Sequence, residues 1–229
     1  MNVNLVKQST IFTMFLAVVS TCILFTSFAY SENMPSFSIG GFGGFTIDMS
    51  TETAELEFYD DTKLDEWEAG TVYGGSVMYR MANGLVLELI VKQFKMEAEE
   101  DGSEIGTLKA TPILLMIGYQ SMPKNQSKFA FHATIGGGFA SSDFDKGDDI
   151  KDLERATGGK IDISNDDAFM IEMGAGVDYF ITRNIAMTLD GRYVVGFIDS
   201  KWEFSNGESE DYTLDIENFQ YLVGLRLWF

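Results

Sequence analysis

The sequence predicts an all-β protein, an eight-stranded antiparallel up-and-down transmembrane β-barrel with short periplasmic turns and long acidic extracellular loops. Apolar and polar residues alternate with a period of two over eight stretches, each long enough to cross a membrane as a tilted strand of about 9–11 residues. The connections between these stretches alternate between short and long, as in bacterial outer-membrane barrels. The composition, with 14% aromatic residues, 23 glycines and 3 prolines, suits a strand-rich chain.

The first element, residues 1–29, is expected to be a secretory signal peptide. Lys7 supplies a positive charge ahead of residues 11–28, which form an apolar run without any charge. Small residues allow cleavage after Ala29, and cleavage after Ser31 fits nearly as well. The protein is therefore expected to leave the cytoplasm.

Two other interpretations of this segment remain open. The apolar run approaches the length of an uncleaved membrane anchor. Cys22, the only cysteine, could instead begin a mature lipoprotein, although apolar residues continue beyond it. With one cysteine there is no intramolecular disulfide, and residues 30–229 are expected to form a single barrel domain.

The barrel strands follow from the alternation. They are predicted at residues 36–48, 70–81, 84–95, 107–120, 127–140, 168–181, 184–198 and 215–229. Odd-numbered positions carry the apolar face in all eight, as in Leu85, Leu87 and Leu89. A soluble sandwich also alternates, but its strands usually span about five or six residues. The odd face is therefore expected to contact lipid, and the even face to line the lumen.

The connections and the charge follow one topology. Short connections are expected at 82–84, 121–127 and 182–184, and long ones at 49–69, 96–106, 141–167 and 199–214. The long ones hold most of the 35 acidic residues, whereas the short side carries Lys124, Lys128 and Arg183. A net charge of −19 argues against nucleic acid as a partner, because phosphates need basic side chains to neutralise them.

Charged residues of both signs fall on the even face and are predicted to form a lumen charge network. They are Arg80, Glu88, Lys92, Glu172, Asp178, Asp190, Arg192 and Arg226. Unpaired charges inside a narrow barrel would carry a large desolvation cost, so they are expected to pair with one another. Arg226 has Asp178 or Asp190 as expected partners. Two interpretations of this network remain open: a structural plug of ion pairs, or a selective polar pore built from the same charges.

Other even positions are apolar and are predicted to line part of the lumen. They are Phe42, Met78, Val86, Ile90, Leu114, Met116, Met170, Leu222 and Trp228. These side chains either pack the interior or accept an apolar solute. Pro112 lacks a backbone N–H and lies early in its strand, where it could open a gap between strands or mark a strand end or bulge.

Catalytic, metal and cofactor sites are not expected. His132 faces inward, but its spacing suggests no serine and aspartate partners for a lipid-modifying enzyme. The stretch DFDKGDD at 143–149 resembles a calcium loop with an incomplete coordination pattern. General attraction of divalent cations to the acidic outer rim is the simpler interpretation.

The last strand resembles the assembly signal of bacterial outer-membrane barrels, with Gly224, Leu225, Leu227 and the terminal Phe229. A more specific resemblance covers roughly the last 120 residues. SKFAFHATIGGGFA at 127–140, GAGVDYFITRNIAMTLDGRYV at 174–194 and KATPILLMIGYQ at 109–120 resemble the OmpW family, and VDYFITRN is the closest part.

The resemblance implies an eight-stranded barrel that passes small hydrophobic molecules across the outer membrane through a largely apolar lumen. This lumen differs in holding many charges, and the loops are more acidic. The alternative is a non-transporting structural or adhesin-like barrel of the OmpA/OmpX type. Expected partners are outer-membrane lipids and lipopolysaccharide, the barrel-assembly machinery through the C-terminal strand, and small hydrophobic solutes.

Overall fold

The computed structural model describes residues 36–48, 66–67, 69–100, 103–121, 127–157, 159–165, 168–204 and 209–229. Eight long strands form the molecule: β1 Ser36–Asp48, β3 Gly70–Arg80, β4 Leu85–Glu100, β5 Ser103–Gln120, β6 Phe129–Lys146, β8 Ala168–Phe180, β9 Ile185–Phe204 and β10 Ser209–Trp228. Shorter elements are β2 Glu66–Trp67, α2 Asp148–Thr157 and β7 Ile161–Asn165. The predicted signal segment and most of 49–69 lie outside the described residues.

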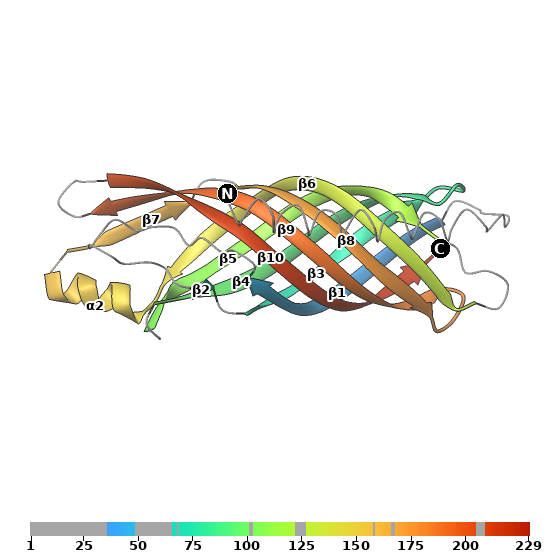
Figure 1. Cartoon of the computed structure of the whole chain (residues 1–229), viewed down its shortest axis with the longest axis horizontal. Helices are drawn as coiled ribbons and strands as arrows, with labels where there is room; N and C mark the ends of the chain where they lie inside the picture. Colours follow the sequence, from blue (N-terminus) through green and yellow to red (C-terminus); the bar gives the residue numbers. More distant parts are fainter. Residues whose placement is uncertain are drawn as a thin grey trace, which may run out of the picture.

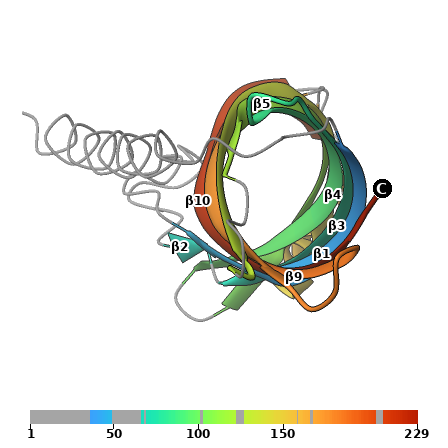
Figure 2. The same ribbon diagram turned by 90° about the vertical axis from the view of Figure 1, so that its right-hand side faces the viewer.

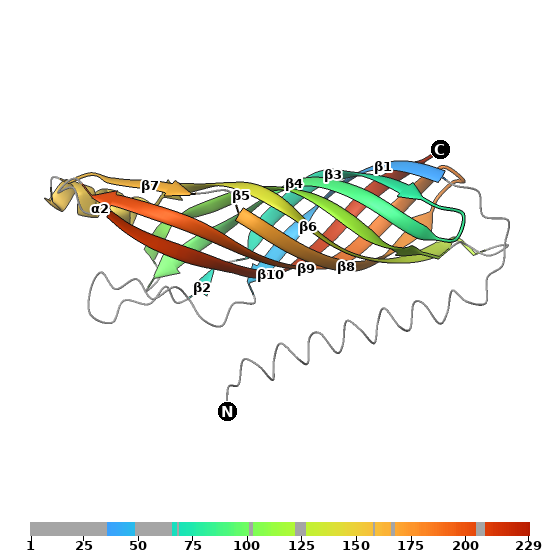
Figure 3. The same ribbon diagram turned by 90° about the horizontal axis from the view of Figure 1, so that it is seen from above.

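The long strands close into a barrel, which confirms the predicted fold class. Each pairs antiparallel with its neighbours in the order β1, β3, β4, β5, β6, β8, β9, β10, and β10 returns to β1. Figure 2 shows the resulting ring end-on, and Figures 1 and 3 show the tilt of the strands. Phe37 and Phe229 exchange backbone hydrogen bonds of 3.3 and 2.8 Å at the seam. No backbone edge is left open between the first and last long strands.

The alternation of exposed odd positions and buried even positions along the strands agrees with the prediction. Odd positions such as Leu115 and Phe131 are exposed large apolar side chains, whereas even neighbours such as Leu114 and His132 are buried. Aromatic pairs stand near both ends of the apolar exterior: Phe37 with Phe229 and Phe129 with Tyr179 at one end, Phe45 with Tyr221 and Phe139 with Phe169 at the other. This is the exterior of a lipid-embedded barrel.

One end of the barrel carries the short connections and is called here the turn end. Gly84 adopts a φ of 88°, and its N–H donates to the carbonyl of Met81 at 3.0 Å. In the turn at 181–184, the Thr182 hydroxyl accepts the N–H of Ile185 at 3.1 Å. Asn184 Nδ2 donates to the carbonyl of Trp228 at 2.8 Å, which ties this turn to the last strand.

The opposite end, called the loop end, corrects the predicted boundaries. The segments 96–106, 141–167 and 199–214 were expected to be loops, but β4, β5, β6, β9 and β10 continue into them. Here the even positions stay apolar and buried, as Met96 and Leu108 do. The odd positions become charged, as at Lys95 and Lys109. These strands continue beyond the apolar exterior of the barrel, so the apolar odd positions end before the strands do.

Helix α2 and strand β7 occupy the loop end (Figure 1). Lys146 Nζ donates to Glu154 Oε1 at 2.8 Å, and the N–H of Ile161 donates to the same oxygen at 2.9 Å. Ile150 of the helix is buried. Among the described residues, no helix is long and apolar enough to cross a membrane.

Glu154 gives this region a predictable pH dependence. Its hydrogen bonds with Lys146 and Ile161 lower its pKa below the ordinary value. The stabilisation is therefore fully present above the ordinary pKa of about 4.3 and is lost as the pH falls through the lower folded value. We expect a spin label at Ala156→Cys to become mobile by electron paramagnetic resonance only in that acidic range. In Glu154→Gln the label should be mobile at every pH, whereas Asp152→Asn should behave as wild type, and equal mobility of all three would contradict the anchor.

Candidate functional site: the barrel interior

The loop-end half of the interior is an apolar cluster, called here the loop-end cluster. It comprises Val72, Ile90, Phe94, Met96, Leu108, Ala110, Leu114, Met116, Ala140, Ala168, Met170, Val194, Ile198, Ile216 and Leu222, with Phe42 and Phe144 packed against it. Six of the apolar lumen candidates belong to it or contact it: Phe42, Ile90, Leu114, Met116, Met170 and Leu222. Methionine side chains are flexible, so this half can repack around small apolar molecules more readily than a rigid core.

Paired charges lie beside the lower members of this cluster and below them, and are called here the charged belt: Glu88, Lys92, Glu172, Asp178, Asp190, Arg192 and Arg226. All seven side chains are buried. Arg192 is the hub, because its guanidinium lies 2.8 Å from Glu172, 3.5 Å from Glu88 and 3.6 Å from Asp190. These residues come from β4, β8, β9 and β10, so the belt spans the width of the barrel.

Lys92 and Arg226 extend the belt on either side of Arg192. Lys92 pairs with Glu172, and its ammonium donates to Gln220 Oε1 at 2.6 Å. Arg226 lies 3.1 Å from Glu88 and 3.2 Å from Asp178. Of the two expected partners of Arg226, the structure brings Asp178 to it, while Asp190 pairs elsewhere.

Further polar side chains complete the belt, and the part that Gln120, Thr188 and Gln220 take in it was not predicted from the sequence. Gln120 donates to Asp178 at 2.5 Å, and Thr188 donates to Asp190 at 3.0 Å. His132 Nε2 lies 2.6 Å from Asp190 Oδ1. The available signal was their even position on a strand, which Gln120, Thr188 and Gln220 share with the charged residues.

Arg80, predicted as a member of the charge network, lies at the turn end against an aromatic ring. Its guanidinium carbon is 5.3 Å from the centre of the Trp228 ring. Arg80 is the last residue of β3 at the turn end, below the belt. A cation over an indole face is an attractive contact, so Arg80 is stabilised in part by the Trp228 ring.

The turn end closes on a second apolar group, called here the turn-end cluster: Met78, Val86, Ala186 and Trp228, with Phe180 packed against them. The Phe180 and Trp228 rings lie 6.2 Å apart. Met78, Val86 and Trp228, predicted as lumen-lining residues, therefore lie on the opposite side of the belt from the other six. Along β4, Glu88 of the belt lies between Val86 of the turn-end cluster and Ile90 of the loop-end cluster, and along β10 Arg226 lies between Trp228 and Leu222.

The β4–β5 ladder is interrupted beside Pro112, although both strands continue through this point. The β4–β5 pairing runs through Val91 with Ile113 and resumes at Phe94 with Ala110, so the register is kept but the two intervening pairs do not form. On the exterior, Gln93 Nε2 donates to the Thr111 hydroxyl at 3.3 Å across the interruption. Pro112 was expected either to open a local gap between strands or to mark a strand end or bulge. The kept register shows a local gap in the backbone pairing and no bulge at this point.

The described residues contain no group of three or more His, Cys, Asp or Glu side chains that could hold a metal ion. The stretch at 143–149, compared above with a calcium loop, forms the end of β6 and the start of α2 instead. Asp145 of this stretch pairs with Lys109 across the β5–β6 ladder.

Comparisons with known proteins agree with this architecture. Residues 20–226 match the family model described as outer membrane protein beta-barrel domain. No curated protein matches the chain. The solved structure of OprG from Pseudomonas aeruginosa, an OmpW-family protein, has a TM-score of 0.68 at 15% identity and covers 87% of this chain and 98% of its own.

A second solved structure, AlkL in lipid bilayers, has a TM-score of 0.50 at 12% identity and covers 88% of this chain and 93% of its own. At these identities the likeness is one of fold. The predicted resemblance to an OmpW-type outer-membrane barrel is confirmed at that level.

Proposed function

Because this chain belongs to the outer-membrane β-barrel family, we propose that it carries small hydrophobic molecules from the cell surface into the outer membrane. The observation that carries the proposal is the position of the ladder interruption. The unpaired segment holds Lys92 of the belt on its inner side, and Ile90, Phe94 and Leu114 of the loop-end cluster flank it. An apolar solute that enters this half meets the charged belt below and a break in the ladder at its side.

The belt argues against a straight route to the periplasm. Its charges are held by one another at 2.8–3.5 Å around Arg192 and Arg226. Moving an apolar solute past them would separate buried ion pairs, and breaking such a pair costs about 3–5 kcal/mol. Exit through the wall beside Lys92 leaves the ion pairs of Arg192 and Arg226 in place and delivers an apolar solute directly to the lipid.

A reversible cross-link tests this route. Cys22 is the only native cysteine and lies in the expected signal segment, so Gln93→Cys with Thr111→Cys gives a defined pair across the interruption. We expect the oxidised variant to lose uptake of an apolar fluorescent probe, N-phenylnaphthylamine, into proteoliposomes, and a reductant to restore it. A matched pair across the continuous β8–β9 ladder, Val177→Cys with Leu189→Cys, should leave uptake unchanged. Equal uptake in the oxidised and reduced Gln93/Thr111 variant would refute the lateral route.

A non-transporting structural or surface-interaction barrel is the second candidate. It is favoured by the full burial of the belt, whose Glu88, Glu172 and Asp178 side chains have no exposed surface. In that case, probe uptake by wild-type proteoliposomes would equal that of empty vesicles, and the function would lie in the acidic loop end.

We propose no catalytic activity. In the described part of the chain, the hydrogen bond of His132 goes to Asp190, and no hydroxyl or thiol bonds to its ring. A nucleophile oriented by a base would be needed for acyl transfer. The lipids of the outer membrane are its surroundings, while lipopolysaccharide, the barrel-assembly machinery at Gly224–Phe229 and cleavage of residues 1–29 remain proposals.

A further inference from the structure

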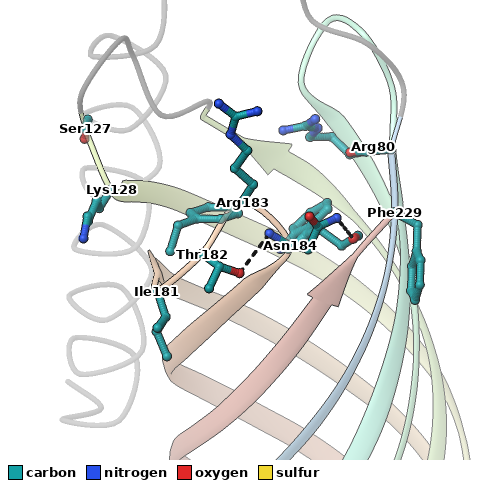
Figure 4. Close-up of a pocket in the computed structure, with 11 residues that line it drawn as sticks. Arg80, Ser127, Lys128, Ile181, Thr182, Arg183, Asn184 and Phe229 are labelled. Atoms are coloured by element: carbon teal, nitrogen blue, oxygen red, sulfur yellow. Dashed lines mark hydrogen bonds between the residues drawn. The ribbon is translucent and has the colours of Figure 1, made fainter.

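A cavity of about 570 Å³ opens at the turn end of the barrel, on the far side of the charged belt from the loop-end cluster. It is formed by the 181–184 turn together with residues at the ends of β1, β3, β8 and β10 (Figure 4). A cavity of this volume falls within the range of small-molecule sites, about 300–1,000 Å³. The lateral route proposed above does not pass through it.

The charge of this cavity is opposite to that of the whole protein. Arg80, Lys128 and Arg183 line it, and none of the described residues of the lining is acidic, although the chain carries a net charge of −19. In Figure 4 the guanidinium groups of Arg80 and Arg183 lie at the open end of the barrel, while Lys128 points away from them. Two guanidinium groups at one opening present the planar donors that oxyanions accept.

The walls beneath these cations are apolar and aromatic. Trp228 and Phe180 pack together at 6.2 Å between ring centres, and Arg80 lies over the indole. Two buried polar atoms of the same lining, Ser36 Oγ and Trp228 Nε1, have no hydrogen-bond partner among the described residues. A buried donor without a partner is costly, and both atoms lie in residues that a ligand in the cavity would contact.

We propose that this cavity binds an amphiphilic oxyanion, a phosphate or carboxylate group attached to an apolar chain, with Arg183 and Arg80 on the anionic group and Phe180 and Trp228 against the chain. The group can come from an anionic phospholipid of the inner leaflet or from a soluble periplasmic molecule. Ile181 and Phe229, which are 52% and 71% exposed, border the cavity on the lipid-facing side. Both sources can therefore reach it.

The test is calorimetric titration of the full mature protein in zwitterionic nanodiscs with hexyl phosphate, using hexanol and inorganic phosphate as partial ligands. Arg183→Gln is the main variant, because Arg183 is exposed and its loss leaves the interior packing unchanged. Arg80→Gln with Arg183→Gln is the stronger variant. Lys151→Gln with Arg155→Gln, exposed on helix α2 at the loop end, removes the same charge elsewhere. Circular dichroism establishes that each variant is folded.

We expect hexyl phosphate to bind more tightly than either partial ligand, and Arg183→Gln to weaken it about tenfold, the equivalent of one charge-assisted hydrogen bond. The α2 variant should bind as wild type does. Unchanged affinity in folded Arg183→Gln, or hexanol binding as tightly as hexyl phosphate, would overturn the site. Adding phosphatidylglycerol to the nanodiscs identifies the source: suppressed titration indicates the lipid headgroup, and unsuppressed titration indicates a soluble anion.

Discussion

Replacing Arg192 by methionine should destabilise the barrel by about 3–5 kcal/mol, because a buried charge cluster that loses one partner keeps the desolvation cost of the others. Arg192 is within 3.6 Å of Glu88, Glu172 and Asp190. Glu88 would retain Arg226, and Glu172 would retain Lys92, but each carboxylate would be less fully compensated. Methionine replaces the apolar stem of Arg192 but not its buried guanidinium, so the effect includes the lost ion pairs and the lost packing of that group.

The measurement is urea unfolding in lipid vesicles, followed by tryptophan fluorescence. Arg155→Met, an exposed arginine on α2 that pairs only with its neighbour Asp152 among the described residues, should shift the midpoint little. A double change, Lys92→Met with Glu172→Leu, should cost less than the sum of the two single changes, since it removes both members of a pair. A midpoint for Arg192→Met equal to that of Arg155→Met would show that the belt contributes nothing.

Gly136→Ala is expected to have the second largest effect, about 3 kcal/mol from overpacking. A Cβ at this inward position would lie 2.1 Å from the carbonyl oxygen of Leu115 and 2.7 Å from the Cα of Met116. Both atoms are backbone of β5, so the neighbouring strand itself would have to move. The cost is therefore larger than for a clash with a flexible side chain.

Gly41→Ala is the matched control for this change. Its Cβ would point outward and meet nothing closer than the Gly74 carbonyl oxygen at 3.9 Å. Urea midpoints in the same vesicles should fall for Gly136→Ala and stay near wild type for Gly41→Ala. Equal midpoints would mean that β5 and β6 are not packed as closely as the backbone distances indicate.

The sequence predicted the eight strands and their lipid-facing parity because one physical rule acts on every residue in a membrane: an apolar odd face such as Leu85, Leu87 and Leu89 must contact lipid. The first strand, 36–48, has the bounds that were expected. Outside the lipid the rule no longer holds. Lys95 and Lys109 sit on the odd face of strands that continue into water, so the strand ends were predicted too early.

The interior was predictable as a set of residues but not as a set of contacts. Inward parity identifies Glu88 and Arg226, yet their pairing joins positions 138 residues apart and depends on strand tilt, which no local pattern encodes. Arg80 shows the same limit. Its even position predicts that it faces the lumen, but the contact with Trp228 depends on its place at the end of β3.

The sequence separations inside the belt bear on how the barrel can assemble. Lys92 contacts Glu172, which follows it by 80 residues in the sequence, and Gln220, which follows it by 128 residues. Glu88 and Asp178 meet Arg226 only when the last strand has arrived. A partly built sheet therefore holds unpaired charges, and a strand inserted one residue out of register would turn those charges toward lipid. Closure by β10 adds the last ion pairs, those of Arg226 with Glu88 and Asp178, and these pairs form only when the register of the closing strand is correct.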